Sequence, residues 1–373
     1  MSILVLADDI TGAAEMAGLA HSMGCSVAFT TAIEQIPLDA EVTVVATDTR
    51  SMGREEAVAV TRRLVNSLRA LPPMPLFKKC DSALRGHLIA EAEELFALGF
   101  RRALILAANP SKGRCVENGI YRINGTPIAE TVFRTDPEFP ATTSEVVALL
   151  GGGVHYLRAD KPLPDAGICI GESRSEREVA AQVARIDAQT LLVGAADAFR
   201  ALLWQQGFRP AAHAPFAGLD CRRTLIALGS TVRHDLSEEP FFQRNRVACC
   251  PMPDAVFDGA SPEGWIAECR AAMTDAESLL LRIPQAVKVD GSKALHLRGA
   301  MAETVASLIH TLHPEEVVIE GGASAFAILA VLGWVDFTVR NEIAPGVVRL
   351  RHAATGTCLT FKPGSYPWGA MFA

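Results

Sequence analysis

The chain has 373 residues, of which 49% are hydrophobic, so it exceeds what one compact core usually supports and two domains are expected. Its formal charge of -7 comes from 42 acidic and 35 basic residues without a basic run, which argues against nucleic acid as a partner. No apolar stretch approaches the roughly 20 residues that span a bilayer, no secretory leader precedes the first strand, and the cysteines lack metal-site spacing. The sequence therefore predicts a soluble, cytoplasmic protein without membrane contact.

Short β-branched runs alternate with stretches of helical period along the first half of the chain. The runs are Ile3–Leu6, Val42–Ala46, Leu104–Ala107, Ile168–Ile170 and Leu191–Val193, and Glu55–Ala70 shows the helical period. This alternation predicts an α/β fold in which a mostly parallel sheet is flanked by helices. Because such sheets bind ligands at the carboxyl ends of their strands, polar clusters directly after strands are the candidate sites.

The first strand ends in two carboxylates, Asp8 and Asp9, and a helix can begin at Thr11-Gly12. Ordinary helix capping explains one aspartate but not both, and paired like charges are costly unless a ligand or a cation uses them. One of the two could accept a proton from a sugar hydroxyl or hold Mg²⁺ through water. The pair is the first candidate for catalysis and substrate binding.

Two further polar segments follow strands, Thr47–Ser51 after the second apolar run and Cys80–Gly86 after a strand that ends at Leu76–Lys79. Their candidate substrate-binding residues are Thr49, Arg50, Lys79, Asp81, Ser82 and Arg85. Arginine can bind a carboxylate through two hydrogen bonds, and Asp81 and Ser82 can bind hydroxyls, although a solvated, salt-bridged turn is the alternative. Asn109–Arg114 also places polar groups at a strand exit, where a plain turn explains the sequence equally well.

The α/β pattern lapses at Gln205–Asp220 into Gly, Pro, Ala and His, and a new apolar run follows at Thr224–Leu228. We therefore expect two domains, residues 1–218 and 219–373. Strands are predicted in the second domain at Glu316–Ile319, Val347–Leu350 and Cys358–Phe361.

Glycine-rich turns follow strands of the second half. Gly229-Ser230-Thr231 and Gly321-Gly322-Ala323-Ser324 each lie between a strand and a helix, where glycine lets the backbone approach a phosphate. Lys362-Pro363-Gly364 follows another strand and could place an ammonium beside a phosphate. Each signal alone is weak, since glycine turns after strands are common in α/β folds.

Taken together, these segments resemble the four-carbon acid sugar kinase family over nearly the whole chain. Leu6–Ala13 is similar to its opening ADD-x-TGA motif, Thr47–Ser51 to its TDTRS motif and Lys78–Gly86 to its KK-x-DSTLRG motif. In the second half, Gly229-Ser230, Glu320–Ser324, Glu342–Gly346 and Lys362–Gly364 are similar to the GS, GG-x-T, E-x-x-PG and K-x-G elements of its nucleotide-binding domain. Tyr366–Trp368 departs from the FG-containing ending that is usual in the family.

The resemblance implies an acid-sugar-binding domain at 1–218, a nucleotide-binding domain at 219–373, and a ligand cleft between them. It also implies ATP-dependent phosphorylation of a substrate such as threonate, erythronate or 3-oxo-tetronate. The expected catalytic residues are Asp9, Asp8, Asp81 and Arg85, and Arg85 with Lys79 would fix the substrate carboxylate. The expected ATP-binding residues are Gly229, Ser230, Thr231, Gly321, Gly322, Ala323, Ser324, Gly346, Lys362 and Gly364. Mg²⁺ would be carried by ATP without direct protein ligands, and a homodimer is one expected assembly.

Two other functions stay open. A regulatory protein that binds the acid sugar but uses ATP poorly would account for the altered ending at Tyr366–Trp368. A phosphatase that forms an aspartyl phosphate at Asp8-Asp9 would need D-x-D-x-T spacing, which this segment lacks.

Overall fold

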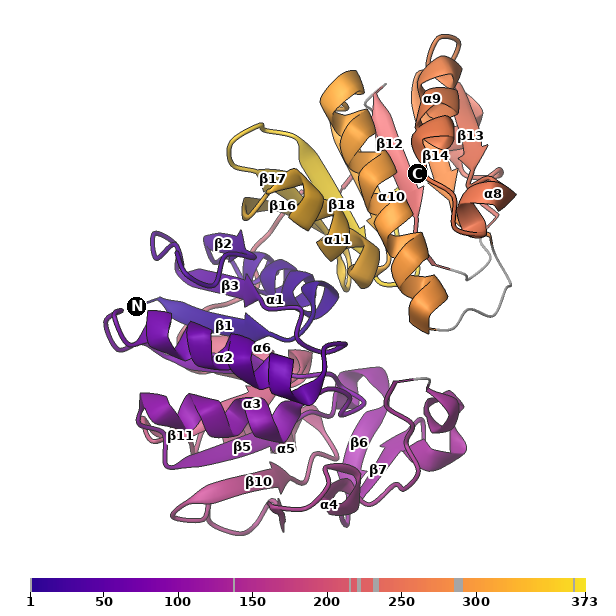
Figure 1. Cartoon of the computed structure of the whole chain (residues 1–373). Coiled ribbons are helices and arrows are strands. Elements are labelled where there is room, and N and C mark those ends of the chain that lie inside the picture. The colour runs from indigo at the N-terminus through magenta and orange to yellow at the C-terminus, as the bar shows by residue number, and fades with distance from the viewer. Residues whose placement is uncertain are drawn as a thin grey trace. The chain divides into compact units, whose positions relative to one another are not determined.

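The structure is a computed structural model that describes residues 2–136, 138–214, 216–219, 223–230, 235–284, 291–364 and 366–373. The chain forms two compact units, Met1–Ala211 and Ala212–Ala373 (Figure 1). The predicted boundary at 218/219 lies a little further along the chain, inside the same stretch rich in Gly, Pro and Ala.

The first unit is built on a parallel sheet with the strand order β2-β3-β1-β4-β11-β5-β10-β9. The strands are β1 (Ile3–Ala7), β2 (Val27–Thr30), β3 (Val42–Ala46), β4 (Leu76–Lys79), β5 (Arg102–Leu106), β9 (Val154–Leu157), β10 (Gly167–Gly171) and β11 (Thr190–Gly194). Every residue of β1, β3 and β11 is buried. Strands that are buried on both faces read as continuous apolar runs, which is why the sequence revealed them.

Helices cover both faces of this sheet (Figure 1). On one face α6 (Ala196–Gln205) packs against α1 (Ile10–Ser22) and α5 (Glu176–Val183), and on the other α2 (Arg54–Leu68) packs against α3 (Leu88–Leu95). Right-handed crossovers require this division, because the chain crosses from β1 to β2 in one direction and from β3 to β4 and β5 in the other. The helices that follow the neighbouring strands β1 and β4 therefore lie on opposite faces of the sheet. Sheets of this kind bind ligands at the carboxyl ends of such a pair of strands.

A small antiparallel sheet follows β5, formed by β6 (Arg114–Glu117), β7 (Ile120–Ile123) and β8 (Thr126–Pro127). Its hairpin turns are Asn118-Gly119 and Asn124-Gly125, each with positive φ at both residues, as type I′ turns require. This sheet was not predicted from the sequence, although Asn-Gly is a hairpin signal. The remaining helical segments of the unit are η1 (Phe96–Leu98), η2 (Pro110–Lys112), η3 (Ile128–Glu130), η4 (Val132–Thr135) and α4 (Val146–Leu149).

The second unit has the strand order β13-β14-β12-β15-β18-β17-β16, parallel from β13 to β18 and antiparallel beyond. The strands are β12 (Thr224–Leu228), β13 (Val247–Pro251), β14 (Ser278–Arg282), β15 (Glu316–Glu320), β16 (Asp336–Ala344), β17 (Val347–His352) and β18 (Cys358–Lys362). The helices are α7 (Pro240–Arg244), α8 (Asp254–Phe257), α9 (Glu263–Ala272), α10 (Gly291–Leu312) and α11 (Gly322–Leu332). Helix α10 packs against both α9 and α11, whereas Phe241 of α7 packs with the C-terminal residues Trp368, Met371 and Phe372.

The predicted fold class is confirmed, since both units are α/β with largely parallel sheets. Val42–Ala46 and Thr224–Leu228 are strands with the predicted bounds, and the other predicted strands differ at their ends. Among the described residues, no helix combines the length and the apolar character that crossing a membrane requires.

Candidate functional site

The three motif segments of the first unit meet at the carboxyl edge of its sheet. Ala7 of β1 lies beside Ala46 of β3 and Lys79 of β4, so the loops that follow these strands begin at the same level. Asp48 and Leu84 turn these loops with φ values of 53° and 62°. Segments far apart in the sequence thereby bring their charged side chains together.

Arg50 is at the centre of the resulting ion pairs. Its Nε and Nη2 donate to the two oxygens of Asp8 at 3.0 and 2.8 Å, and Nη2 also donates to Asp9 Oδ1 at 2.6 Å. Its Nη1 lies 3.6 Å from Asp81 Oδ1. Burial raises the pKa of Asp8, but Arg50 and nearby lysines outweigh burial and hold this pKa below its usual value. The paired aspartates are therefore stabilised as anions by a cation from another motif.

Arg85 forms a bidentate pair with Asp81, from Nε to Oδ2 at 2.9 Å and from Nη2 to Oδ1 at 3.0 Å. Its Nη1 also donates to Asp136 Oδ2 at 3.2 Å. Burial raises the pKa of Asp81, but Arg50 and Arg85 more than offset this and hold the pKa far below its usual range. Arg85, which was expected to bind a substrate carboxylate, thus already binds two carboxylates of the protein.

Asp9 caps α1, since its Oδ1 accepts the Gly12 N–H at 3.0 Å and its Oδ2 accepts the Thr11 hydroxyl. A Cβ at Gly12 would lie 2.4 Å from Asp9 Oδ1 and 3.0 Å from Lys79 Nζ, so a side chain at this position would displace Asp9. Lys79 donates to the Cys80 carbonyl at 2.8 Å. Its buried ammonium therefore lies at the start of α1 close to Asp9.

A buried ion pair supports the Thr47–Ser51 loop. Glu91 of α3 lies 2.7 Å from Lys78 Nζ and accepts the hydroxyl of Thr49. Burial lowers the pKa of Lys78, but Glu91 and Asp8 raise it above its usual value. Thr49 was expected to bind substrate, but its exposed fraction is 0% and its hydroxyl is bonded to Glu91. The bond between Thr49 and Glu91 therefore helps to hold the loop that carries Arg50 in place.

Residues of the small sheet hold Ser82, and η4 contributes a ring beside the two neighbouring arginines. Arg114 Nη1 of β6 donates to Ser82 Oγ at 2.5 Å, and the Tyr121 hydroxyl of β7 donates to the Ser82 carbonyl. The guanidinium carbons of Arg85 and Arg114 each lie 5.6 Å from the centre of the Phe133 ring. The motif loop is thus fixed by a substructure that the sequence analysis did not assign to the site.

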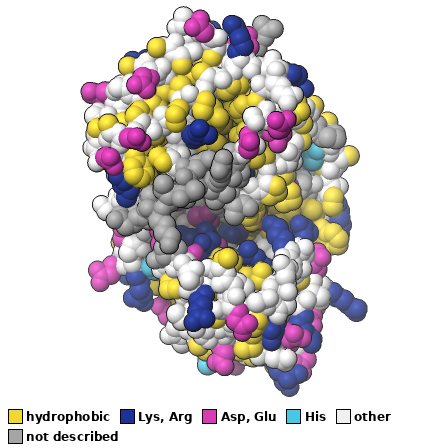
Figure 2. Space-filling model, turned by 90° about the vertical axis from the view of Figure 1, so that its right-hand side faces the viewer, with side chains coloured by type: hydrophobic (Ala, Val, Ile, Leu, Met, Phe, Trp, Pro, Cys, Tyr) yellow, Lys and Arg dark blue, Asp and Glu magenta, His cyan; other side chains and the backbone are white. Residues whose placement is uncertain are grey.

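Glu15, Glu91 and Asp136 of this cluster were missed by sequence reasoning, whereas Lys112 and Arg114 lie in the Asn109–Arg114 segment, for which a plain turn had been left as an equal alternative. Glu15 pairs with Lys112 at 2.7 Å, and its position as the one charged residue of α1 was an available signal. Glu91 shares a short helix with Glu93 and Glu94, so its sequence did not distinguish it. Figure 2 shows the face of the molecule on which dark blue Lys and Arg side chains gather beside magenta carboxylates.

Three predicted phosphate-binding loops of the second unit also begin at one edge. Leu228 of β12 lies beside Glu320 of β15, which lies beside Lys362 of β18. The Gly229 N–H donates to the Glu320 carbonyl at 3.0 Å, and the Gly321 N–H donates to the Lys362 carbonyl at 2.9 Å. The carboxyl ends of β12, β15 and β18 are therefore tied together at these glycines.

Helix α11 begins directly at this edge. A Cβ at Gly229 would lie 2.2 Å from Ser324 Oγ in the first turn of α11, and Gly321 has a φ of 99°, which favours glycine. The first N–H groups of a helix, here those of Gly322, Ala323 and Ser324, have no intrahelical acceptor. The arrangement gives a phosphate close access to backbone donors.

Lys362 does not lie at an open surface. Its exposed fraction is 0%, and Nζ donates to Glu320 Oε1 at 2.7 Å and to the carbonyls of Pro363 and Gly364 at 3.0 and 3.1 Å. Nζ also lies 4.5 Å from the centre of the Trp368 ring. Because an ammonium has three N–H donors, these acceptors use all of them. The cation is thus enclosed by the protein, and its predicted contact with a phosphate stays a prediction.

The other predicted ATP-binding residues are close to the same loops. A Cβ at Gly364 would lie 2.9 Å from Ser230 Oγ, and a Cβ at Gly346, in the turn between β16 and β17, would lie 2.6 Å from the Tyr366 ring. The unusual ending thus packs against this turn. Thr231 lies outside the described residues.

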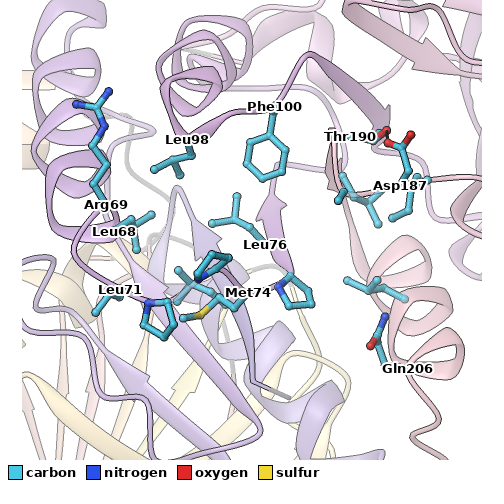
Figure 3. A pocket seen from close by; sticks show the side chains of 18 of the residues that line it. Leu68, Arg69, Leu71, Met74, Leu76, Leu98, Phe100, Asp187, Thr190 and Gln206 are labelled. Carbon is cyan, nitrogen blue, oxygen red and sulfur yellow. Dashed lines mark hydrogen bonds between the residues drawn. The ribbon is translucent and has the colours of Figure 1, made fainter.

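A cavity of 660 Å³ lies at the opposite, amino edge of the first unit's sheet (Figure 3). Leu4, Leu76 and Thr190 mark the amino ends of β1, β4 and β11 there, and apart from Arg69 and Asp187 the lining side chains are uncharged. An acid sugar has a carboxylate and several hydroxyls to satisfy. The charged carboxyl edge suits such a ligand better than this cavity does.

A family model described as a sugar-binding N-terminal domain matches residues 3–201. The D-threonate kinase of Bordetella bronchiseptica is 28% identical, over 92% of this chain and 88% of that protein, and the 3-oxo-tetronate kinase of Brucella melitensis is 23% identical, over 100% and 94%. A crystal structure described as a putative tRNA synthase from Salmonella typhimurium LT2 shares the fold, with a TM-score of 0.80 at 19% identity over 100% of this chain and 98% of that one. The chain belongs to the four-carbon acid sugar kinase family, with its sugar-binding N-terminal domain at residues 3–201.

Proposed function

We propose that this chain is an ATP-dependent kinase that phosphorylates a hydroxyl of a four-carbon acid sugar such as threonate, erythronate or 3-oxo-tetronate. The proposal is carried by the ion-pair cluster of Asp8, Asp9, Arg50, Asp81 and Arg85 in the sugar-binding domain. Relatives named D-threonate kinase, 3-oxo-tetronate kinase and D-erythronate kinase support this substrate class.

Asp9 is the carboxylate best placed to touch the acceptor hydroxyl. The Asp8 side chain is 5% exposed and bidentate to Arg50, whereas the Asp9 side chain is 14% exposed. Asp9 orients the hydroxyl and accepts its proton, and Arg50 and Lys79 balance the charge of Asp9. Asp8 and Asp81 keep the cations in position.

The second unit provides the ATP site of this proposal, because its glycine loops fit phosphates. A Cβ at Gly229 or Gly364 would collide with its neighbours. Only glycine therefore lets the loops at this edge pack so closely together. Ser230, Ser324 and the first N–H groups of α11 bind the phosphates, and Lys362 holds the Pro363-Gly364 loop. ATP supplies the phosphoryl group and carries Mg²⁺, and the protein contributes positioning and charge neutralisation.

A regulatory protein that binds the acid sugar without using ATP is the second candidate. It is favoured by one observation, which is that Lys362, the lysine at the predicted phosphate loops, is enclosed by Glu320 and by Trp368 of the unusual ending.

The test is incubation of the protein with Mg-ATP and a panel of threonates, erythronates and 3-oxo-tetronates, followed by measurement of ADP. We expect turnover of one acid sugar, lowered about 100-fold or more in Asp9→Asn, with ATP affinity unchanged by calorimetry. If calorimetry detects acid-sugar binding but no acid sugar yields ADP, the regulatory function replaces the kinase.

A further inference from the structure

Carboxylates neutralise the cations in and around the ion-pair cluster unequally. Arg50, Lys78, Arg85 and Lys112 each pair with a carboxylate at 3.2 Å or less, and Lys79 lies 3.9 Å from Glu15. For Arg114, the described part of the chain offers no carboxylate within the 4.0 Å of a salt bridge. Its side chain is a partly exposed cation beside the site.

The hydrogen-bond partner of Arg114 is the uncharged side chain of Ser82. Arg114 Nη1 donates to Ser82 Oγ at 2.5 Å, which satisfies one N–H without balancing the charge. A guanidinium has five N–H donors in a fork that matches a carboxylate. The charge of Arg114 extends into the cluster, because burial raises the pKa of Glu15 but Lys79, Lys112 and Arg114 lower it overall.

The position of Arg114 is fixed by packed structure on both sides. Ser82, its hydrogen-bond partner, is anchored through its carbonyl by the Tyr121 hydroxyl, and the Tyr121 side chain is fully buried. Arg114 and Arg85 lie at equal distances from the Phe133 ring, 5.6 Å from its centre. Arg114 of β6 therefore lies beside the same Phe133 ring as Arg85, and the residue that it contacts, Ser82, directly follows Asp81 in the motif loop.

We propose that Arg114 binds the carboxylate of the acid sugar and thereby makes the site select an acid over a neutral polyol. This inference rests on the proposed function. Arg85 is less suited to the role, since Nε and Nη2 bind Asp81 and Nη1 binds Asp136. Lys79 is also less suited, since its ammonium is buried and bonded to the Cys80 carbonyl. Arg114 offers an unneutralised fork, and Ser82 offers a hydroxyl beside it.

Arg114→Gln tests the inference because it removes the charge and keeps most of the side chain. The KM for the acid sugar should rise about 10- to 100-fold, as expected for the loss of charge-assisted hydrogen bonds, whereas the KM for ATP should stay within about twofold. Arg122→Gln is the matched control. Arg122 lies on β7 opposite Cys115 and donates to the Gly125 carbonyl, so this variant should keep the wild-type KM values.

The second measurement is the preference for the acid sugar over the neutral four-carbon polyol with the same hydroxyl configuration. If Arg114 only supported the fold, its replacement would not change this preference. Wild type should prefer the acid to the polyol, and Arg114→Gln should reduce that preference by the same factor that it raises the KM. Arg114→Lys, which keeps the charge and loses the fork, should lie between them and replaces Arg114→Gln if that variant does not fold. A folded variant with the wild-type preference overturns the inference and leaves the kinase standing.

Calorimetric Kd values for the acid sugar without ATP separate the two proposals. Wild-type binding that weakens in Arg114→Gln supports Arg114 as the carboxylate site even if no ADP is formed, in which case the kinase proposal fails alone. No binding of any acid sugar to wild type overturns both.

Discussion

At residue 12 the backbone of α1 runs so close to two charged side chains that any larger residue requires at least one of them to move. A methyl group on Gly12 would contact Asp9 Oδ1 at 2.4 Å and Lys79 Nζ at 3.0 Å. We expect Gly12→Ala to displace Asp9 and to lower kcat/KM for the acid sugar about 100-fold, the cost of misplacing a catalytic group by about 1 Å. Gly53→Ala is the control in steady-state assays, since nothing lies within 4 Å of its Cβ position. Wild-type kinetics in Gly12→Ala would remove Asp9 from the mechanism.

Lys362 is a charged residue whose contribution we expect to be structural. Its ammonium and the Glu320 side chain are both 0% exposed and 2.7 Å apart. Removal of one partner of a buried ion pair typically costs about 3–5 kcal/mol, so Lys362→Met should lower the free energy of unfolding by about that amount in urea titrations without nucleotide. Lys362→Met combined with Glu320→Gln should recover part of the loss. Unchanged stability together with weaker ATP binding would instead mean that the ammonium acts on the nucleotide.

At the scale of elements, burial explains several of the strands that could be predicted, although the short strand β2 was not predicted despite being buried at every residue. The buried runs of β3 and β12 were predicted with their observed bounds, whereas β16 mixes exposed and buried residues with charges such as Arg340 and gives no continuous apolar run. The motif loops were located because they directly follow predicted strands. Arg114 and Glu91 could not be assigned to the site, because their contacts with Ser82 and Thr49 span 32 and 42 residues and only the folded sheet creates them.

The contact between β12 and α11 should control the nucleotide site. A Cβ at Gly229 would lie 2.2 Å from Ser324 Oγ and 2.9 Å from the Glu320 carbonyl, and the backbone carbonyl cannot move aside as a side chain can. We expect Gly229→Ala to separate β12 from α11 and to weaken ATP binding about tenfold or more in calorimetric titrations. Gly264→Ala in α9, where nothing lies within 4 Å, should leave ATP affinity unchanged and stabilise its helix slightly. Equal ATP affinities in the two variants would exclude this edge as the nucleotide site.

At the scale of the whole molecule, the buried charges should give the protein a broad plateau of stability against pH. For Asp8 and Asp81, burial raises the pKa but the surrounding cations lower it overall from 3.8. A depressed carboxyl pKa stabilises the fold above the unfolded value and loses this effect as pH falls through the folded value. For Lys78 and Lys79, burial lowers the pKa but nearby carboxylates raise it above 10.5. Their stabilisation is complete below 10.5 and is lost as pH rises further.

Burial also raises the pKa of Cys25 and Cys80 from 9.0 to about 12, so unfolding becomes easier once the pH exceeds about 9. Urea unfolding followed by circular dichroism from about pH 2 to pH 11 should therefore give a nearly constant free energy of unfolding between about pH 5 and pH 8, with a decline at either end. Asp81→Asn isolates one of these groups, because it removes a buried anion that faces Arg50 and Arg85. This variant should be less stable than wild type at pH 7, and the difference should shrink below pH 3.8, where wild type also loses the benefit of that charge. A difference that stays constant down to pH 2 would show that the ion pairs of Asp81 do not stabilise the folded state, and the electrostatic account of the ion-pair cluster would then have to be abandoned.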